Sequence, residues 1–92
     1  MNNIEVLYFS ATYCGPCKAF KQTVKQFEAN HPDLIVDHII VDEGDTSMYV
    51  AKEHGVSSVP TLIFKVDGEV KSRLTGVKTI QQVERALEDI TF

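Results

Sequence analysis

Short apolar runs alternate along the chain with longer segments of helical periodicity. Apolar runs of strand length cover residues 4–10 (IEVLYFS), 34–41 (LIVDHIIV) and 61–66 (TLIFKV). Near-continuous hydrophobicity of this kind is typical of strands that are covered on both faces of a sheet. A fourth strand is expected over residues 69–74, because Asp67-Gly68 is a strong signal for a tight hairpin turn.

A first helix is expected between the first two strands, over residues 16–30. Its apolar and small side chains recur at helical spacing, while the lysines between them would face water; the inward set is Ala19, Phe20, Val24 and Phe27. Pro32 should end this helix, because the residue before a proline avoids the helical conformation. A helix between two such strands predicts a β-α-β unit with parallel strands.

Two further helices follow from capping signals. Thr46 or Ser47 is expected to cap a short helix that runs through His54 and stops at Gly55. The spacing Thr79-x-x-Gln82 is the signature of a capping box at the start of the last helix. One face of that helix is predicted to be apolar, with Ile80, Val83, Leu87 and Ile90.

The predicted order of elements is β-α-β-α-β-β-α, an α/β fold with a four-stranded mixed sheet flanked by helices on both faces. Residues 1–92 are expected to form one domain, because domains typically contain about 100–200 residues. The aromatic residues of the predicted strands and helix should form the core: Tyr8, Phe9, Phe20, Phe27 and Phe64. Met48 and Tyr49 are expected to pack, with a place near the active-site face as the alternative, and the acidic stretch 42–45 is expected to be a solvated loop.

Composition and charge narrow the possible functions. Apolar residues make up 43% and charged residues 24%, which is ordinary for a globular domain. A net charge of −4 makes nucleic acid or an anionic membrane surface a poor partner, since both require a basic face. No apolar run approaches the ~20 residues of a membrane span. The first residues lack the basic and apolar regions of a secretory signal, so a cytoplasmic location is expected.

The two cysteines, Cys14 and Cys17, carry the clearest chemical signal. A disulfide that closes so short a loop removes little entropy from the unfolded chain, so a chemical or metal-binding role is expected rather than a structural disulfide. A C-x-x-C pair between a strand and a helix start is typical of a redox motif. The helix N-terminus carries partial positive charge, which stabilises the nucleophilic thiolate.

Position along the helix predicts a role for each cysteine. Cys14, at the very end, should be the exposed attacking thiol. Cys17, one turn later, should be shielded and close enough to resolve a mixed disulfide on Cys14. Gly15 allows a tight bend at the helix start, and Pro16 lacks the N–H that would be unpaired there.

A second candidate element is Val59-Pro60, just before the third strand. An isolated proline at this place would be a trans residue that starts a strand. Beside this C-x-x-C and this strand order, a cis Val59–Pro60 bond is expected. The backbone of Val59 would then be free to pair with an extended substrate segment next to Cys14.

The sequence resembles the thioredoxin family over nearly its whole length. The motifs that match are Tyr13-Cys14-Gly15-Pro16-Cys17-Lys18, Gly55-Val56, Val59-Pro60-Thr61, Asp67-Gly68-Glu69-Val70 and Gly76. The resemblance implies a thioredoxin fold, reduction of protein disulfides and a cis proline at Pro60. It further implies that substrate contacts Tyr13, Gly15, Pro16, Val59, Pro60 and Gly76.

Three departures from the family pattern bear on mechanism. The chain begins at the strand before the C-x-x-C, without the usual first strand and helix, as in short glutaredoxin-like thioredoxins. Tyr13 stands where thioredoxins usually have tryptophan. Tyr8 takes the place of the family's buried acid, and His38 falls near the place of its lysine partner. Without that acid, Cys17 is expected to be activated more slowly, or through Tyr8, His38 or water.

Three alternatives to a thioredoxin-type reductase remain open. A glutaredoxin-like enzyme recharged by glutathione is favoured by chain length and disfavoured by Cys-Gly-Pro-Cys. An interaction module with incidental redox activity would not need both cysteines. Structural zinc normally has four ligands, and the chain has a single cysteine pair without histidines at ligand spacing. We expect no cofactor and no metal. The expected substrates are proteins that contain disulfides, and a thioredoxin reductase or the glutathione system is expected to recharge the protein. A monomer is expected.

Overall fold

The elements follow the predicted order in the computed structural model, which describes residues 3–91. Strand β1 (Ile4–Ser10) leads into helix α1 (Gly15–Asn30), and strand β2 (Val36–Ile40) leads into helix α2 (Asp45–Glu53). The remaining elements are strand β3 (Thr61–Val66), strand β4 (Glu69–Thr75) and helix α3 (Ile80–Thr91).

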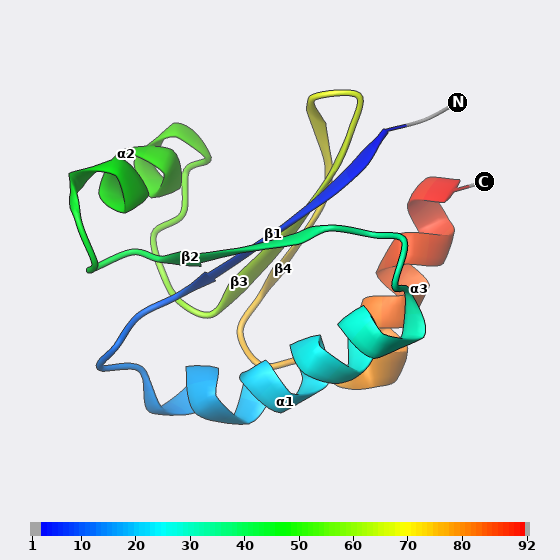
Figure 1. Ribbon diagram of the computed structural model, residues 1–92, viewed down its shortest axis with the longest axis horizontal. Helices are drawn as coiled ribbons and strands as arrows, with labels where there is room; N and C mark the ends of the chain where they lie inside the picture. The colour runs from blue at the N-terminus through cyan, green and yellow to red at the C-terminus, as the bar shows by residue number, and fades with distance from the viewer. Residues whose placement is uncertain (1–2, 92) are drawn as a thin grey trace.

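The four strands form one mixed sheet in the order β2-β1-β3-β4. Strands β1 and β2 are parallel, and β3 is antiparallel to both β1 and β4. Helices α1 and α3 cover one face of the sheet, and α2 lies on the other (Figure 1). The predicted architecture is therefore confirmed.

Alternation along the central strands divides the core into two clusters, because successive side chains of a strand point to opposite faces. The larger lies under α1 and α3, and its buried members are Val6, Tyr8, Phe20, Val24, Phe27, Leu62, Phe64, Val83, Ala86 and Leu87. The smaller lies on the α2 side and consists of Leu7, Phe9, Ala51 and Ile63. All five aromatic residues predicted for the core are at most 2% exposed.

Two local signals have the expected geometry. Asp67 and Gly68 both have positive φ, 52° and 86°, as a tight hairpin turn requires. The Gln82 N–H donates to Thr79 Oγ1 at 3.1 Å, and the Thr79 N–H donates to Gln82 Oε1 at 2.9 Å. These reciprocal bonds form the predicted capping box.

The ends of two elements differ from prediction. Strand β2 begins at Val36 rather than residue 34, because the Leu34 N–H donates to the His31 carbonyl in a turn after α1. Helix α2 begins at Asp45, following Gly44 with φ of 110°, and no side chain caps it. The capping roles expected of Thr46 and Ser47 were therefore wrong.

Three apolar residues predicted to pack are exposed. Ala19 lies on the outer side of α1, because the inward row of this helix starts at Cys17 and continues through Phe20. Met48 and Tyr49 are 47% and 65% exposed, because α2 turns only Ala51 fully toward the sheet. Within residues 3–91, no helix is long and apolar enough to cross a membrane.

Candidate active site

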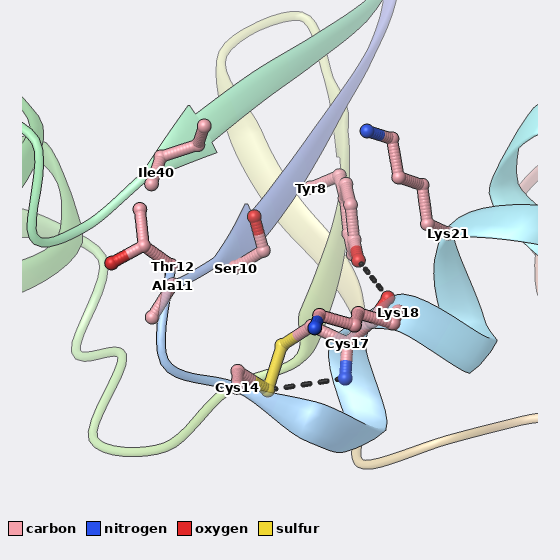
Figure 2. A pocket seen from close by; sticks show the side chains of 9 residues that line it. All are labelled: Tyr8, Ser10, Ala11, Thr12, Cys14, Cys17, Lys18, Lys21 and Ile40. Atoms are coloured by element: carbon pink, nitrogen blue, oxygen red, sulfur yellow. Dashed lines mark hydrogen bonds between the residues drawn. A yellow bond between two sulfur atoms is a disulfide. The ribbon is translucent and has the colours of Figure 1, made fainter.

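A disulfide joins Cys14 and Cys17 where β1 passes into α1 (Figure 2). Cys14 is the N-cap residue of α1, and the two Cα atoms are 5.3 Å apart. The Cys17 N–H, one of the amides that a helix start leaves unpaired, donates to Cys14 Sγ at 3.1 Å. Gly15 and Pro16 form the exposed first turn between the two cysteines.

Both cysteines are largely covered in this oxidised state. Cys14 is 6% exposed and Cys17 is 4% exposed, so the expected contrast between an exposed and a shielded thiol is wrong here. The reason is that both pack in one small cluster with Ala11, against which Val41 and Val59 also lie. Cys14 thus exposes little more of its surface than Cys17 does while the disulfide is formed.

The surroundings of Cys14 Sγ favour a thiolate once the disulfide is reduced. The N-terminus of α1 directs partial positive charge and the Cys17 N–H toward this sulfur. The first turn of α1 contains no acidic residue that would oppose the charge. Lys18 lies beside the pair and adds a positive charge (Figure 2). Such an environment lowers the pKa of a cysteine and raises its thiolate fraction.

The loop before β3 completes the edge of the site. The Val59–Pro60 peptide bond is cis, as expected. Gly76, with φ of 89°, donates its N–H to the Pro60 carbonyl at 2.9 Å and so joins the end of β4 to this loop. No hydrogen bond to the backbone of Val59 is found within residues 3–91. Val59 and Gly76, two predicted substrate contacts, therefore meet through Pro60 beside the cysteine cluster.

Among the large apolar residues within 3–91, Tyr13 is the most exposed, with 76% of its surface open. It directly precedes Cys14 and lines two hollows on the α2 side of the disulfide. Its role in substrate contact stays a prediction, which this exposure favours.

Tyr8 connects the redox pair to the core. Its ring is buried, and its hydroxyl donates to the Cys17 carbonyl oxygen at 3.1 Å (Figure 2). Burial raises the pKa of Tyr8 above the usual value of 10.0, so the phenol stays protonated at neutral pH. Tyr8 is therefore a hydrogen-bond donor here and not a base.

His38 lies opposite Tyr8 on the neighbouring strand. The two residues pair in register between β2 and β1, and their rings meet edge to face at 5.5 Å. His38 Nε2 lies 3.1 Å from Glu28 Oε1, and this contact joins the edge strand β2 to α1. This imidazole therefore has a carboxylate partner on α1, and the ring of Tyr8 lies beside it.

A pocket of about 180 Å³ opens behind the disulfide, between β1 and α1. Polar groups of Tyr8, Ser10 and Thr12 line it, and Lys18 and Lys21 stand at its α1 side. Cys17 contributes to its wall. The pocket is polar enough and large enough to hold water next to the resolving sulfur.

A tether between Thr12 and Asp42 was missed by the sequence analysis, which placed Asp42 in a solvated loop. The Thr12 N–H donates to Asp42 Oδ1 at 3.0 Å, and the Thr12 hydroxyl donates to Oδ2. The hydroxyl bond first, and then the backbone bond, lower the pKa of Asp42. The two residues are 30 positions apart, and no local sequence pattern indicates that they pair. Their hydrogen bonds nevertheless tie the loop before Cys14 to the residues that follow β2.

Metal binding finds no support in the side chains near the pair. Among residues 3–91, no group of three or more histidine, cysteine or acidic side chains is arranged to hold an ion. The chemistry that the geometry offers is exchange between the Cys14–Cys17 disulfide and a second thiol or disulfide.

Comparison with known proteins assigns this arrangement to a family. The thioredoxin family model matches residues 1–89. Thioredoxin-1 of Caenorhabditis elegans is 31% identical over 88 residues, which cover 96% of this chain and 74% of that protein. Mitochondrial thioredoxin O2 of Arabidopsis thaliana is 34% identical over 76 residues, which cover 83% of this chain and 47% of that protein. The chain thus spans only about half the length of this second relative.

Solved structures agree with the sequence matches. Oxidised mitochondrial thioredoxin 3 of Saccharomyces cerevisiae superposes with a TM-score of 0.83 at 30% identity. The match covers 97% of this chain and 80% of the yeast chain. A Trypanosoma brucei thioredoxin matches with a TM-score of 0.84 at 22% identity, which supports the fold alone.

Proposed function

The chain belongs to the thioredoxin family, and from that premise we propose that it is a thiol–disulfide oxidoreductase that reduces protein disulfides. The single observation that carries the proposal is the disulfide between Cys14 and Cys17 at the N-terminus of α1. A pair so placed can accept two electrons as a disulfide and return them as two thiols. The tetrapeptide Cys-Gly-Pro-Cys is the active-site sequence of the family that the chain resembles.

The first step is attack by the Cys14 thiolate on a substrate disulfide. A bond forms between Cys14 Sγ and one substrate sulfur, and the other substrate sulfur leaves as a thiolate that takes up a proton. The helix N-terminus and Lys18 favour the attacking thiolate. The free backbone of Val59 can pair with the substrate main chain while the bond exchanges, which is the mode of strand addition at an open edge.

In the second step Cys17 resolves the mixed disulfide. Its thiolate attacks Cys14 Sγ, the second substrate sulfur leaves and is protonated, and the Cys14–Cys17 disulfide is restored. The substrate gains two electrons and two protons, and the protein loses them. We infer that the Cys17 proton leaves through water in the 180 Å³ pocket, because the Tyr8 hydroxyl is already donated to the Cys17 carbonyl.

The cycle requires a partner that reduces the disulfide again. We propose a dithiol reductase of the thioredoxin reductase class, with glutathione as the alternative donor. The protein would thereby carry electrons from that reductase to its substrates and help maintain cell redox balance. A reducing compartment such as the cytoplasm suits this chemistry, since thiol pools there keep cysteines reduced. A monomer suffices, because one chain provides both cysteines and their surroundings.

A coupled assay tests the proposal. NADPH consumption with a protein disulfide is followed beside a bacterial thioredoxin reductase, and in parallel beside glutathione and glutathione reductase. A rate with the first system alone supports a thioredoxin, and a rate with glutathione alone assigns the protein to the glutaredoxin side. Activity driven only by dithiothreitol points to a dedicated reductase. Absence of exchange under all three conditions would overturn the proposal.

Cysteine variants test the order of attack. Cys14→Ser should abolish reduction, because no nucleophile then starts the exchange. Cys17→Ser should retain the first step and accumulate a mixed disulfide, visible as a mass adduct under non-reducing conditions. An adduct on Cys17 in the Cys14→Ser protein, with turnover above background, would reverse the assignment.

A further inference from the structure

The pocket behind the disulfide is electropositive, although the chain as a whole has a net charge of −4. Two lysines, Lys18 and Lys21, line it together with the hydroxyl groups of Tyr8 and Ser10 (Figure 2). Among residues 3–91, no acidic side chain belongs to this lining. Positive charge and hydroxyl groups around one cavity favour a bound anion.

Neither lysine is neutralised by a carboxylate. No ion pair of Lys18 or Lys21 is found within residues 3–91. Both side chains are exposed and flexible, so their ammonium groups can turn toward an ion. Asp42, an acid beside the pocket, accepts two hydrogen bonds from Thr12, whose hydroxyl points away from both lysines in Figure 2. An anion would thus gain two unpaired cations against some repulsion from Asp42.

The pocket also adjoins the sulfur that must lose a proton in the second step. Cys17 forms part of its wall, and its volume is about 180 Å³, several times the ~30 Å³ of one water molecule. An ion of the size of phosphate therefore fits beside Cys17. The lining offers no carboxylate or imidazole as a base, and the Tyr8 hydroxyl already donates to the Cys17 carbonyl. A bound anion could supply the base that this pocket lacks.

We propose that this pocket binds a small basic oxyanion, such as hydrogen phosphate, through Lys18 and Lys21, and that the ion accepts the Cys17 proton during resolution. The inference rests on the proposed oxidoreductase function and concerns its second step. The Cys17 thiol gives its proton to the ion, and the resulting thiolate forms a bond to Cys14 Sγ. The bond from Cys14 Sγ to the substrate sulfur breaks, and that sulfur leaves as a thiolate and takes a proton from water. Water in the pocket serves as the acceptor where the ion is absent.

A neutral aromatic disulfide, dithiodipyridine, separates the two steps in time. Attack by Cys14 releases one coloured thiopyridone, and resolution by Cys17 releases the second. The protein is reduced beforehand with dithiothreitol and freed of it, and phosphate is varied at constant pH and ionic strength. The rate of the second release should rise to a plateau about tenfold above the phosphate-free rate, less than the roughly 10²–10⁴-fold of a positioned side chain. The first release should not accelerate, because it requires no proton from Cys17.

Lys21→Gln is the test variant, and Lys25→Gln is its matched control. Lys21→Gln should raise the phosphate concentration at half of the plateau by about fivefold, the upper range for one exposed ion pair. Lys25 lies one turn further along α1, is exposed and does not line the pocket, so its loss removes the same charge elsewhere. Lys25→Gln should keep the half-plateau concentration of the wild type.

Two further measurements separate binding from proton transfer. Sulfate resembles phosphate in shape but is a far weaker base, so it should compete with phosphate without accelerating the second release. In the oxidised protein, phosphate should shift the amide resonances of Ser10, Cys17 and Lys21 with a saturating dependence that is weakened in Lys21→Gln.

Several outcomes would overturn the anion site while leaving the proposed function intact. One is a second release that rises linearly with phosphate, because ions in solution would then take the proton. Others are equal acceleration by sulfate, an equal response of Lys21→Gln and Lys25→Gln, or amide resonances that phosphate does not shift. Absence of any thiopyridone release would instead contradict the proposed function itself.

Discussion

At the scale of single residues, the most informative contact is between Tyr8 and the main chain of Cys17. The phenol is buried in the larger core cluster and donates its only proton to a carbonyl of the first turn of α1. It thereby links the position of the resolving cysteine to the packing of the sheet. Its raised pKa means that this bond persists across neutral pH.

Tyr8→Phe should therefore lower stability without changing the chemistry of resolution. Loss of one buried hydrogen bond costs about 0.5–1.5 kcal/mol, to be measured by urea unfolding of the oxidised protein. Release of substrate from the mixed disulfide should keep the pH dependence of the wild type, because the phenol is not a base. An altered pH profile would instead give Tyr8 a part in proton transfer. Tyr49→Phe, at a residue that is 65% exposed, is the control and should leave stability unchanged.

The same residue predicts how stability changes in alkali. The folded pKa of Tyr8 lies above its unfolded value of 10.0, so the folded state holds this proton more tightly. The contribution is fully present below pH 10 and is lost as pH rises through the folded pKa. The stability advantage of the wild type over Tyr8→Phe should thus shrink above pH 10. An advantage that grows in this range would contradict the direction of the shift.

At the scale of elements, local sequence determines some boundaries and tertiary contacts determine others. Helix α3 belongs to the first kind, because Thr79 and Gln82 exchange two hydrogen bonds at its start. Helix α2 belongs to the second, because it starts after Gly44 without a side-chain cap. The two helices should therefore respond differently to changes at their N-termini.

Thr79→Ala should destabilise the protein by about 1 kcal/mol, within the usual range for loss of an N-cap. In a domain of this size, that corresponds to a fall in Tm of roughly 4–8 °C. Thr79→Ser keeps the hydroxyl and should restore most of the loss. The rate of disulfide exchange should be unaffected in both, since Thr79 lies outside the cysteine cluster. Equal melting of Thr79→Ala and the wild type would show that packing alone fixes this helix.

The sequence predicted elements well where a pattern and a turn signal coincided. Strands β1 and β3 have the expected ends, and the turn at Asp67 and Gly68 has the expected positive φ. Strand β2 was predicted too long, because Leu34 and Ile35 continue its apolar pattern. The backbone of Leu34 instead belongs to a turn, in which its N–H donates to the His31 carbonyl. The burial of Met48 and Tyr49 on α2 was predicted wrongly, because the spacing of apolar residues in this helix does not reveal which of its faces meets the sheet.

Prediction of the site reached the two cysteines and, through the family resemblance, the cis Val59–Pro60 bond, but it missed other long-range contacts. A C-x-x-C between a strand and a helix is a local signal, and it identified Cys14 and Cys17 directly. Val41 and Val59 pack against the cluster that contains Cys14, although both are far from it in the sequence. The Thr12–Asp42 tether likewise arises only when β1 and β2 lie side by side. No pattern within one segment could have indicated them.

At the scale of the whole molecule, the two faces of the sheet are unequally held. On one face α1 and α3 each contribute three buried residues to the larger core cluster. On the other face α2 contributes one buried residue, Ala51, with Val50 partly buried beside it. Because burial of apolar surface is the main source of stability, α2 is attached by far less free energy than α1 or α3. Helix α2, which lines a hollow together with Tyr13, is thus the helix most easily moved.

Amide hydrogen exchange of the native oxidised protein should reveal this inequality. Amides of α2 should exchange through local opening, at a free energy several kcal/mol below that of the slowest amides in α1 and β3. Their exchange should depend little on low urea concentrations, since local opening exposes little surface, while the slowest amides follow global unfolding. Ala51→Gly should speed exchange in α2 while α1 changes much less. Equal protection of α1 and α2 would mean that the sheet holds both faces as one unit.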